Sequence, residues 1–152
     1  MKAKKINMTQ IFSDSGVVEP VTLVVLETPT NLPLAKGEVP QAEGVLKEGD
    51  IVSVSGISKG KGFQGVVKRH GFKGGPRSHG QKHSEREPGS IGGGGRAGGK
   101  VAKGMRMAGR MGGERVTVKN LRVVKILPET KEIFISGAIP GRRGTFLEIK
   151  SK

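Results

Sequence analysis

The chain has 152 residues, no cysteine, tryptophan or tyrosine, and a formal net charge of +14 at pH 7. Without cysteine it can form neither a disulfide framework nor a thiolate zinc site. No apolar run approaches the roughly 20 residues of a membrane span, and no apolar signal core follows the basic start of the chain. We therefore expect a cytoplasmic protein, without a membrane partner, whose charge is matched by a permanent anionic partner.

The first third of the chain contains patterns typical of strands. Residues 6–12 and 17–27 are rich in β-branched side chains and flank a predicted turn at 13–16, and residues 51–55 alternate between apolar and small polar side chains. Between them, the proline-rich segment 28–48 has little periodicity and is expected to be a loop.

A second group of strands is expected after residue 113. The pattern predicts strands at 116–127, 132–136 and 145–150, separated by turns at 128–130 and 140–144. Many short strands separated by turn residues, with no convincing helix, predict a mainly β fold, a small antiparallel β-barrel.

Between these groups lies a basic, glycine-rich stretch at 56–113. It holds 19 of the 26 glycines and 13 of the 27 lysines and arginines, but only two acids, Glu85 and Glu87. Its apolar residues follow no stable period, so we expect a long irregular extension that does not fold alone. The predicted organisation is a barrel domain of residues 1–55 and 114–152, with 56–113 inserted between its strands.

The composition of this extension predicts a nucleic-acid partner. A polyanion would neutralise the charge, and glycine lets backbone N–H groups approach phosphates closely. Two phenylalanines are too few for binding based on base stacking, so recognition of backbone and shape is expected. The candidate contact residues are the cationic, histidine and amide side chains Lys59, Lys61, Gln64, Lys68, Arg69, His70, Lys73, Arg77, His79, Lys82, His83, Arg86, Arg96, Lys100, Lys103, Arg106, Arg110 and Arg115.

Motifs for other chemistry are incomplete. Residues 60–65 match G-x-G-x-x-G but are not followed by the amphipathic helix of a dinucleotide site. Residues 94–100 match G-x-x-x-x-G-K, but Val101 stands where Ser or Thr would hold Mg²⁺. His79 and His83 lack further ligands that would complete a metal site. We expect no catalytic residues, no metal, no cofactor and no small-molecule substrate.

Several segments, taken together, resemble the L3 family of proteins of the large ribosomal subunit, in its bacterial form. They occur between residues 8 and 141 in the order of the family, which is more specific than any single motif. The matching segments are 8–12, 60–72, 74–76, 78–80, 88–92, 107–112, 114–118 and 137–141.

The resemblance implies a β-barrel of the translation-protein type and a structural, non-enzymatic role. It implies that the extension 56–113 is threaded into large-subunit ribosomal RNA toward the peptidyl transferase centre. It also implies contacts with neighbouring ribosomal proteins and an early role in assembly near the 3′ end of that RNA. Segment 28–48 is shorter than its counterpart in the family, and Arg110 replaces a glutamine that is methylated in some relatives.

Two alternatives to this interpretation remain open. A DNA-compacting protein could use the same kind of basic, glycine-rich arm, and equal affinity for duplex DNA and ribosomal RNA would favour it. A nucleotide-using enzyme could be built on residues 60–65, and calorimetric detection of NAD or ATP binding would favour that.

Overall fold

The chain folds into two compact units, Met1–Lys59 together with Glu114–Lys152, and Gly60–Gly113. The computed structural model describes residues 1–13, 16–27, 46–93, 95 and 98–151. Most of the loop expected at 28–48 therefore lies outside the described residues. The described residues are mainly β, as their patterns predict, and no helix among them is long and apolar enough to cross a membrane.

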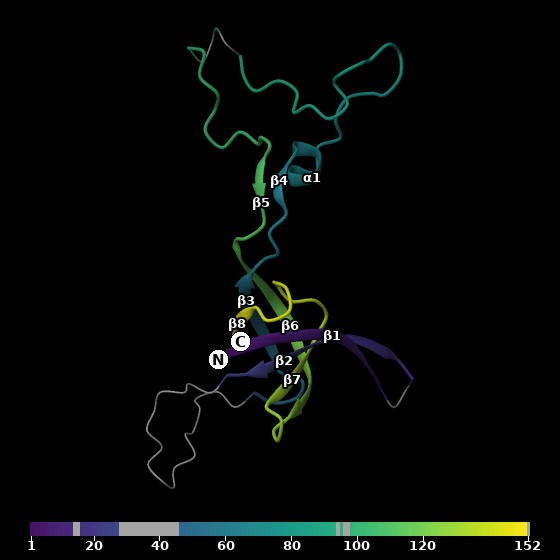
Figure 1. Cartoon of the computed structure of the whole chain (residues 1–152), viewed down its shortest axis with the longest axis vertical. Helices are drawn as coiled ribbons and strands as arrows, with labels where there is room; N and C mark the ends of the chain where they lie inside the picture. The colour runs from purple at the N-terminus through teal and green to yellow at the C-terminus, as the bar shows by residue number, and fades with distance from the viewer. Residues whose placement is uncertain (14–15, 28–45, 94, 96–97, 152) are drawn as a thin grey trace. The chain divides into compact units, whose positions relative to one another are not determined.

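The first unit is a closed antiparallel sheet of six strands (Figure 1). The order around the ring is β1, β2, β7, β6, β3 and β8, and residues 146–148 of β8 pair with residues 2–4 of β1. Each strand therefore has a hydrogen-bonded neighbour on both sides. The strands are Lys2–Phe12 for β1, Val18–Leu26 for β2, Ile51–Ile57 for β3, Arg115–Leu127 for β6, Glu132–Ser136 for β7 and Phe146–Ser151 for β8.

All six strands predicted for the ring are confirmed, but two extend at least two residues beyond the sequence pattern. β1 begins at Lys2 because its first residues pair with β8, and β3 continues to Ile57, which lies opposite Arg115 of β6. The predicted turn after β6 is also present, with the Lys131 N–H donating to the Pro128 carbonyl at 3.3 Å. Pairing between distant strands thus extends elements beyond their local pattern.

Alternate residues of the strands point into the ring and form one core. Register shifts in β1, β3 and β6 mark irregularities of the β-bulge type, which increase local twist and help a small sheet curve until it closes. The buried apolar side chains that pack together in this core are Ala3, Val24, Leu46, Val52, Val54, Val123, Ile133, Ile135, Ile139, Leu147 and Ile149.

A lysine occupies one of the inward positions. Lys5 follows Ala3 by two residues on β1, and only 6% of its surface is exposed. Its Nζ donates to the carbonyls of Ile139 at 2.8 Å and Gly141 at 3.1 Å. Burial lowers the pKa of Lys5, and the nearby charge of Lys59 lowers it further. The ammonium is thus hydrogen-bonded, but its charged form is disfavoured by the loss of water.

The backbone of Lys5 contacts the same loop. Its N–H donates to the Thr145 carbonyl at 3.0 Å, and its carbonyl accepts from the Gly144 N–H at 2.7 Å. Together with the side-chain bonds, these contacts fasten the loop between β7 and β8 to β1. Lys5 therefore stabilises the part of the ring where the first and last strands meet.

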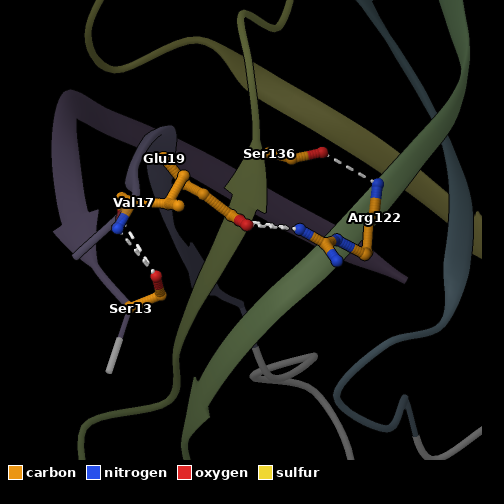
Figure 2. A network of polar contacts seen from close by, with 5 residues as sticks. All are labelled: Ser13, Val17, Glu19, Arg122 and Ser136. Atoms are coloured by element: carbon orange, nitrogen blue, oxygen red, sulfur yellow. Dashed lines mark hydrogen bonds and ion pairs between the residues drawn. The ribbon is translucent and has the colours of Figure 1, made fainter. Parts of the chain in front are cut away.

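Arg122 of β6 and Glu19 of β2 form an ion pair that spans the intervening strand β7 (Figure 2). One guanidinium nitrogen donates to both carboxylate oxygens at 2.7 Å, and the Arg122 backbone N–H donates to Ser136 Oγ at 3.0 Å. In the same view, the Ser13 hydroxyl accepts from the Val17 N–H at the turn between β1 and β2. An exposed ion pair of this kind contributes only about 0.2 to 1 kcal/mol, so it adds to a ring that hydrogen bonds already close.

The second unit contains a two-stranded antiparallel sheet and one helical turn, which lie together in Figure 1. The elements are β4 (Gly62–Gln64), α1 (Val66–His70) and β5 (Gly109–Met111). The expectation that 56–113 has no regular structure is therefore wrong for the two ends of this stretch. Pairing between β4 and β5 joins residues far apart in sequence, so no local periodicity could reveal it. Val66, which is 2% exposed, shows that this unit also buries an apolar side chain.

We expect the substitution Lys5→Met to lower the free energy of unfolding of the full chain by about 1 to 3 kcal/mol at neutral pH, because two carbonyls lose their donor. The folded-state pKa of Lys5 is below the ordinary value of 10.5. Burying the charged ammonium therefore lowers the free energy of unfolding by its full amount below the folded-state pKa. This penalty is relieved as the pH rises from the folded-state pKa to the pKa of Lys5 in the unfolded chain. In urea unfolding, the stability advantage of the wild type over Lys5→Met should widen through this interval.

Lys4→Met is the matched control, because the exposed Lys4 lies over the Phe146 ring at 6.0 Å rather than inside the ring of strands. Loss of this cation–π contact should lower the free energy of unfolding by less than about 1 kcal/mol. A wild-type advantage over Lys5→Met that stays constant with pH, or equal effects of the two substitutions, would contradict the role assigned to Lys5.

Candidate nucleic-acid interface

The cationic side chains of the second unit are mostly open to solvent. Among the described candidates within Gly60–Gly113, only Gln64, Arg69 and His70 are half-buried, and the others are exposed. Lys59 and Arg115 belong to the first unit, and Arg96 lies outside the described residues. The predicted contact residues are thus largely accessible to a polyanion.

Local backbone geometry fixes the start of this unit. The Lys61 N–H donates to the Met111 carbonyl at 2.9 Å, which holds the strands β4 and β5 together. Gly65 then caps α1 in an extended conformation and accepts the first helical hydrogen bond from the Arg69 N–H at 2.9 Å. The helix ends after one turn at Gly71, whose φ of +74° favours glycine. This geometry gives Lys68, Arg69 and His70 defined directions.

Two basic side chains of α1 converge on one backbone carbonyl. Arg69 Nη1 donates to Met107 O at 2.8 Å, and His70 Nε2 lies 3.0 Å from the same oxygen. The His70 ring is also tilted against the Phe72 ring, with centroids 6.0 Å apart. Lys68, by contrast, is exposed. The structure thus brings Arg69 and His70 together with the segment that leads into β5, an association that their spacing in the sequence does not indicate.

A second closure lies at residues 74–85. The Gly75 N–H is shared between the carbonyls of Ser84 at 3.2 Å and Glu85 at 3.1 Å. The two segments pass so closely that a Cβ on Gly74 would lie 1.8 Å from the Glu85 oxygen, and Gly74 has a φ of +76°. This closed loop carries four of the predicted contact residues, Arg77, His79, Lys82 and His83.

Arg77 forms an ion pair with Glu85 across the closed loop. Arg77 Nη2 lies 2.7 Å from Glu85 Oε1, and the two side chains are 81% and 46% exposed. An open depression beside this pair is lined by Pro76, Gln81 and Lys82. Because exposed pairs are weak, a phosphate can compete with Glu85 for the planar guanidinium.

Arg115 also has an acidic partner. Its guanidinium donates to both carboxylate oxygens of Glu148 on β8, across the intervening strand β3. This hydrogen-bonded pair raises the pKa of Arg115 and lowers the pKa of Glu148. Of the two candidate contact residues in the first unit, Lys59 and Arg115, Arg115 is therefore already paired within the protein.

The motifs considered for other chemistry do not form sites in the described residues. Gly62 opens β4 and Gly65 caps a helix of five residues, whereas a dinucleotide site needs a long helix after a buried strand. The G-x-x-x-x-G-K match at 94–100 lies partly outside the described residues. In the described part of the chain, no three histidine, aspartate or glutamate side chains are grouped closely enough to hold a metal ion.

Sequence reasoning missed the contacts that give this unit its internal order. It assigned Arg69 and His70 only to ligand contact, although both hold the Met107 carbonyl. It also included Gly74 and Gly75 in an extension expected to be irregular. The glycine pair was a local signal only for a turn, since adjacent glycines mark turns and loops.

We expect Gly74→Ala to open the loop 74–85, because the new Cβ would collide with the Glu85 carbonyl and strain a left-handed backbone. In limited trypsin digestion of the full chain, cleavage after Arg77 and Lys82 should become several-fold faster than in the wild type. Gly80→Ala is the matched control, because Gly80 has a similar φ of +78° but nothing lies within 4 Å of its Cβ position. Equal acceleration by both substitutions would show that backbone strain, and not the close approach at Gly74, controls the loop.

The comparisons with known proteins agree on one family. The family model "Ribosomal protein L3" matches residues 3–137. The large ribosomal subunit protein uL3 of Streptococcus pyogenes is 40% identical over 199 aligned residues, which cover 97% of this chain and 94% of that protein.

Two further relatives match a shorter region more strongly. The uL3 proteins of Chloroherpeton thalassium and Chlorobium limicola are 53% and 54% identical, over 69% and 70% of this chain. In both cases the match covers 50% of the relative, so the chain spans about half the length of these two proteins. With the match of the family model over most of its length, the chain belongs to the ribosomal protein L3 family.

Proposed function

We propose that this protein is a structural constituent of the large ribosomal subunit that binds large-subunit ribosomal RNA directly. The observation that carries the proposal is family membership combined with a separate, strongly basic unit whose cationic side chains are exposed. The relatives are named as proteins of the large ribosomal subunit, a structural and non-enzymatic family, which confirms the expectation that the chain is not an enzyme.

The RNA-binding extension is residues 56–113, as the sequence predicts, and it acts by charge and backbone shape. Its exposed lysines and arginines contact phosphates and 2′-hydroxyls, and its glycines allow the backbone to approach the RNA. Only Phe63 and Phe72 are available as aromatics in this stretch, so stacking contributes little. Binding of this kind releases counterions and is therefore strongly dependent on salt.

The first unit is the barrel domain of the translation-protein type and fixes where the extension begins and ends. Its closed sheet supports this assignment, because β3 and β6, the strands before and after the extension, are paired neighbours. The Ser58 N–H donates to the Glu114 carbonyl at 2.9 Å at the edge of this pair. In the assembled subunit the barrel contacts neighbouring ribosomal proteins.

The place of the extension in the subunit follows from the same family relationship. It reaches toward the peptidyl transferase centre, and the protein binds early in assembly, near the 3′ end of the large-subunit RNA, in the bacterial cytoplasm. No cofactor or metal takes part in this role.

Filter binding tests the proposed partner. The full chain is titrated with a 3′-terminal large-subunit RNA fragment and with duplex DNA of equal length, from low to high salt. We expect a preference for the RNA that persists at high salt, because shape recognition adds to the electrostatic attraction. Equal affinities for the RNA and the DNA that fall in parallel as salt increases would identify a generic polyanion binder. This result would favour the DNA-compacting alternative.

Replacing three exposed lysines of the extension tests which unit contacts phosphate. We expect the variant with Lys61, Lys68 and Lys73 all changed to Ala to bind the RNA more weakly. The slope of log affinity against log salt should become shallower by about 0.7 to 0.9 for each phosphate that the variant no longer neutralises.

A control variant removes the same number of positive charges from the ring of strands. Lys119, Lys125 and Lys150 are exposed there and can be changed to Ala together. We expect this variant to keep most of the slope, because its lysines lie outside the extension. Equal slopes for both variants would mean that the charge of the whole protein, and not the extension, determines binding.

A further inference from the structure

We propose that Arg69 and His70 are positioning residues that fasten the segment just before β5 at Met107, and that Lys68 alone among the basic residues of α1 remains free for phosphate. This inference depends on the proposed function only where it concerns the effect of the contact on RNA binding. The contact itself is a property of the free protein.

The helical spacing places Arg69 and His70 on the same face of α1 as a buried residue. Val66, Arg69 and His70 stand at positions i, i+3 and i+4, which share one face of a helix. Val66 is buried, and Arg69 and His70 are half-buried, whereas Lys68 is exposed. The face that carries Arg69 and His70 is therefore turned toward the protein.

Arg69 and His70 converge on one backbone oxygen. Arg69 Nη1 and His70 Nε2 lie 2.8 and 3.0 Å from the Met107 carbonyl, 38 and 37 residues further along the chain. One carbonyl oxygen has two lone pairs and can accept both donors. Together the two bonds extend the closure that the β4–β5 pair begins by fastening α1 to the residues just before β5. We call this arrangement of Arg69, His70 and the Met107 carbonyl the Met107 clamp.

The Met107 clamp needs the space that Gly109 leaves. A Cβ at Gly109 would lie 2.6 Å from Arg69 Nη1 and 3.3 Å from Arg69 Cζ. The φ of Gly109 is not in the left-handed region, so its backbone does not itself require glycine. The guanidinium lies against this glycine, which opposes Gln64 in the β4–β5 pair. The absence of a side chain at Gly109 thus seats Arg69.

The physical consequence is preorganisation. Ordering the backbone and side chains beside the β4–β5 pair costs conformational entropy, and residues already ordered in the free protein do not pay that cost when RNA binds. The Met107 clamp therefore raises RNA affinity without contributing a phosphate contact. This distinguishes Arg69 from Lys68, whose contribution is electrostatic.

Gly109→Ala tests this role because it displaces the end of a flexible arginine side chain while removing no charge. In limited trypsin digestion of the free full chain, we expect cleavage after Arg106, relative to cleavage after Lys82, to rise about fivefold, the effect of losing one ordinary hydrogen bond. Gly60→Ala is the control, because nothing lies within 4 Å of its Cβ position and its φ is not left-handed.

RNA binding supplies the second measurement. Gly109→Ala should weaken affinity for the RNA fragment several-fold with an unchanged salt slope, whereas Lys68→Ala should make the slope shallower by about 0.7 to 0.9. The double variant of Arg69→Ala with Gly109→Ala should cleave after Arg106 no faster than Arg69→Ala alone, because both changes remove the same contact.

The two measurements separate the possible failures. If relative cleavage after Arg106 is as slow in Gly109→Ala as in Gly60→Ala, the Met107 clamp is overturned, whether or not RNA binds. Faster cleavage with unchanged RNA affinity would overturn its positioning role. Loss of RNA preference in the wild type would instead refute the proposed function, and the digestion would still decide whether the Met107 clamp exists.

Discussion

Closure of the ring between β8 and β1 is the constraint on which the first unit depends. The pairing is short, residues 2–4 against 146–148, yet it leaves every strand with two neighbours. Because the sheet closes, the inward rows of all six strands meet in one small core. The same register turns Lys5 inward, where backbone carbonyls of the loop before β8 must replace the water that its ammonium loses. Those bonds fasten this loop to β1.

The second unit is ordered by different means. A stretch so rich in glycine and like charge cannot build a large core, because few apolar side chains are available to offset the loss of backbone freedom. Its order comes from a short strand pair, one helical turn and side chains that bond to backbone carbonyls. Such contacts are few and lie close to solvent. The exposed cations between them remain available to an anionic partner, as the proposed role in RNA binding requires.

The sequence predicted the strands of the ring well and their partners not at all. Alternation at 51–55 and the turn after Leu127 are local signals, and both are present in the structure. The pairing of β3 with β8, or of β4 with β5, joins residues far apart in sequence and has no local signal. For the candidate interface, composition identified the basic residues. It could not show that Arg69 and Arg115 already have partners within the protein.

The sequence by itself determined the mainly β character of the chain, the basic stretch and, through its motifs, the family. These depend on residue types and short-range patterns, which local physical chemistry sets directly. Only the tertiary structure decided which strands close the ring, that Lys5 lies inside it, and that Gly109 makes room for Arg69 beside the Met107 carbonyl. Each of these depends on distances between distant segments, and such distances exist only after the chain has folded.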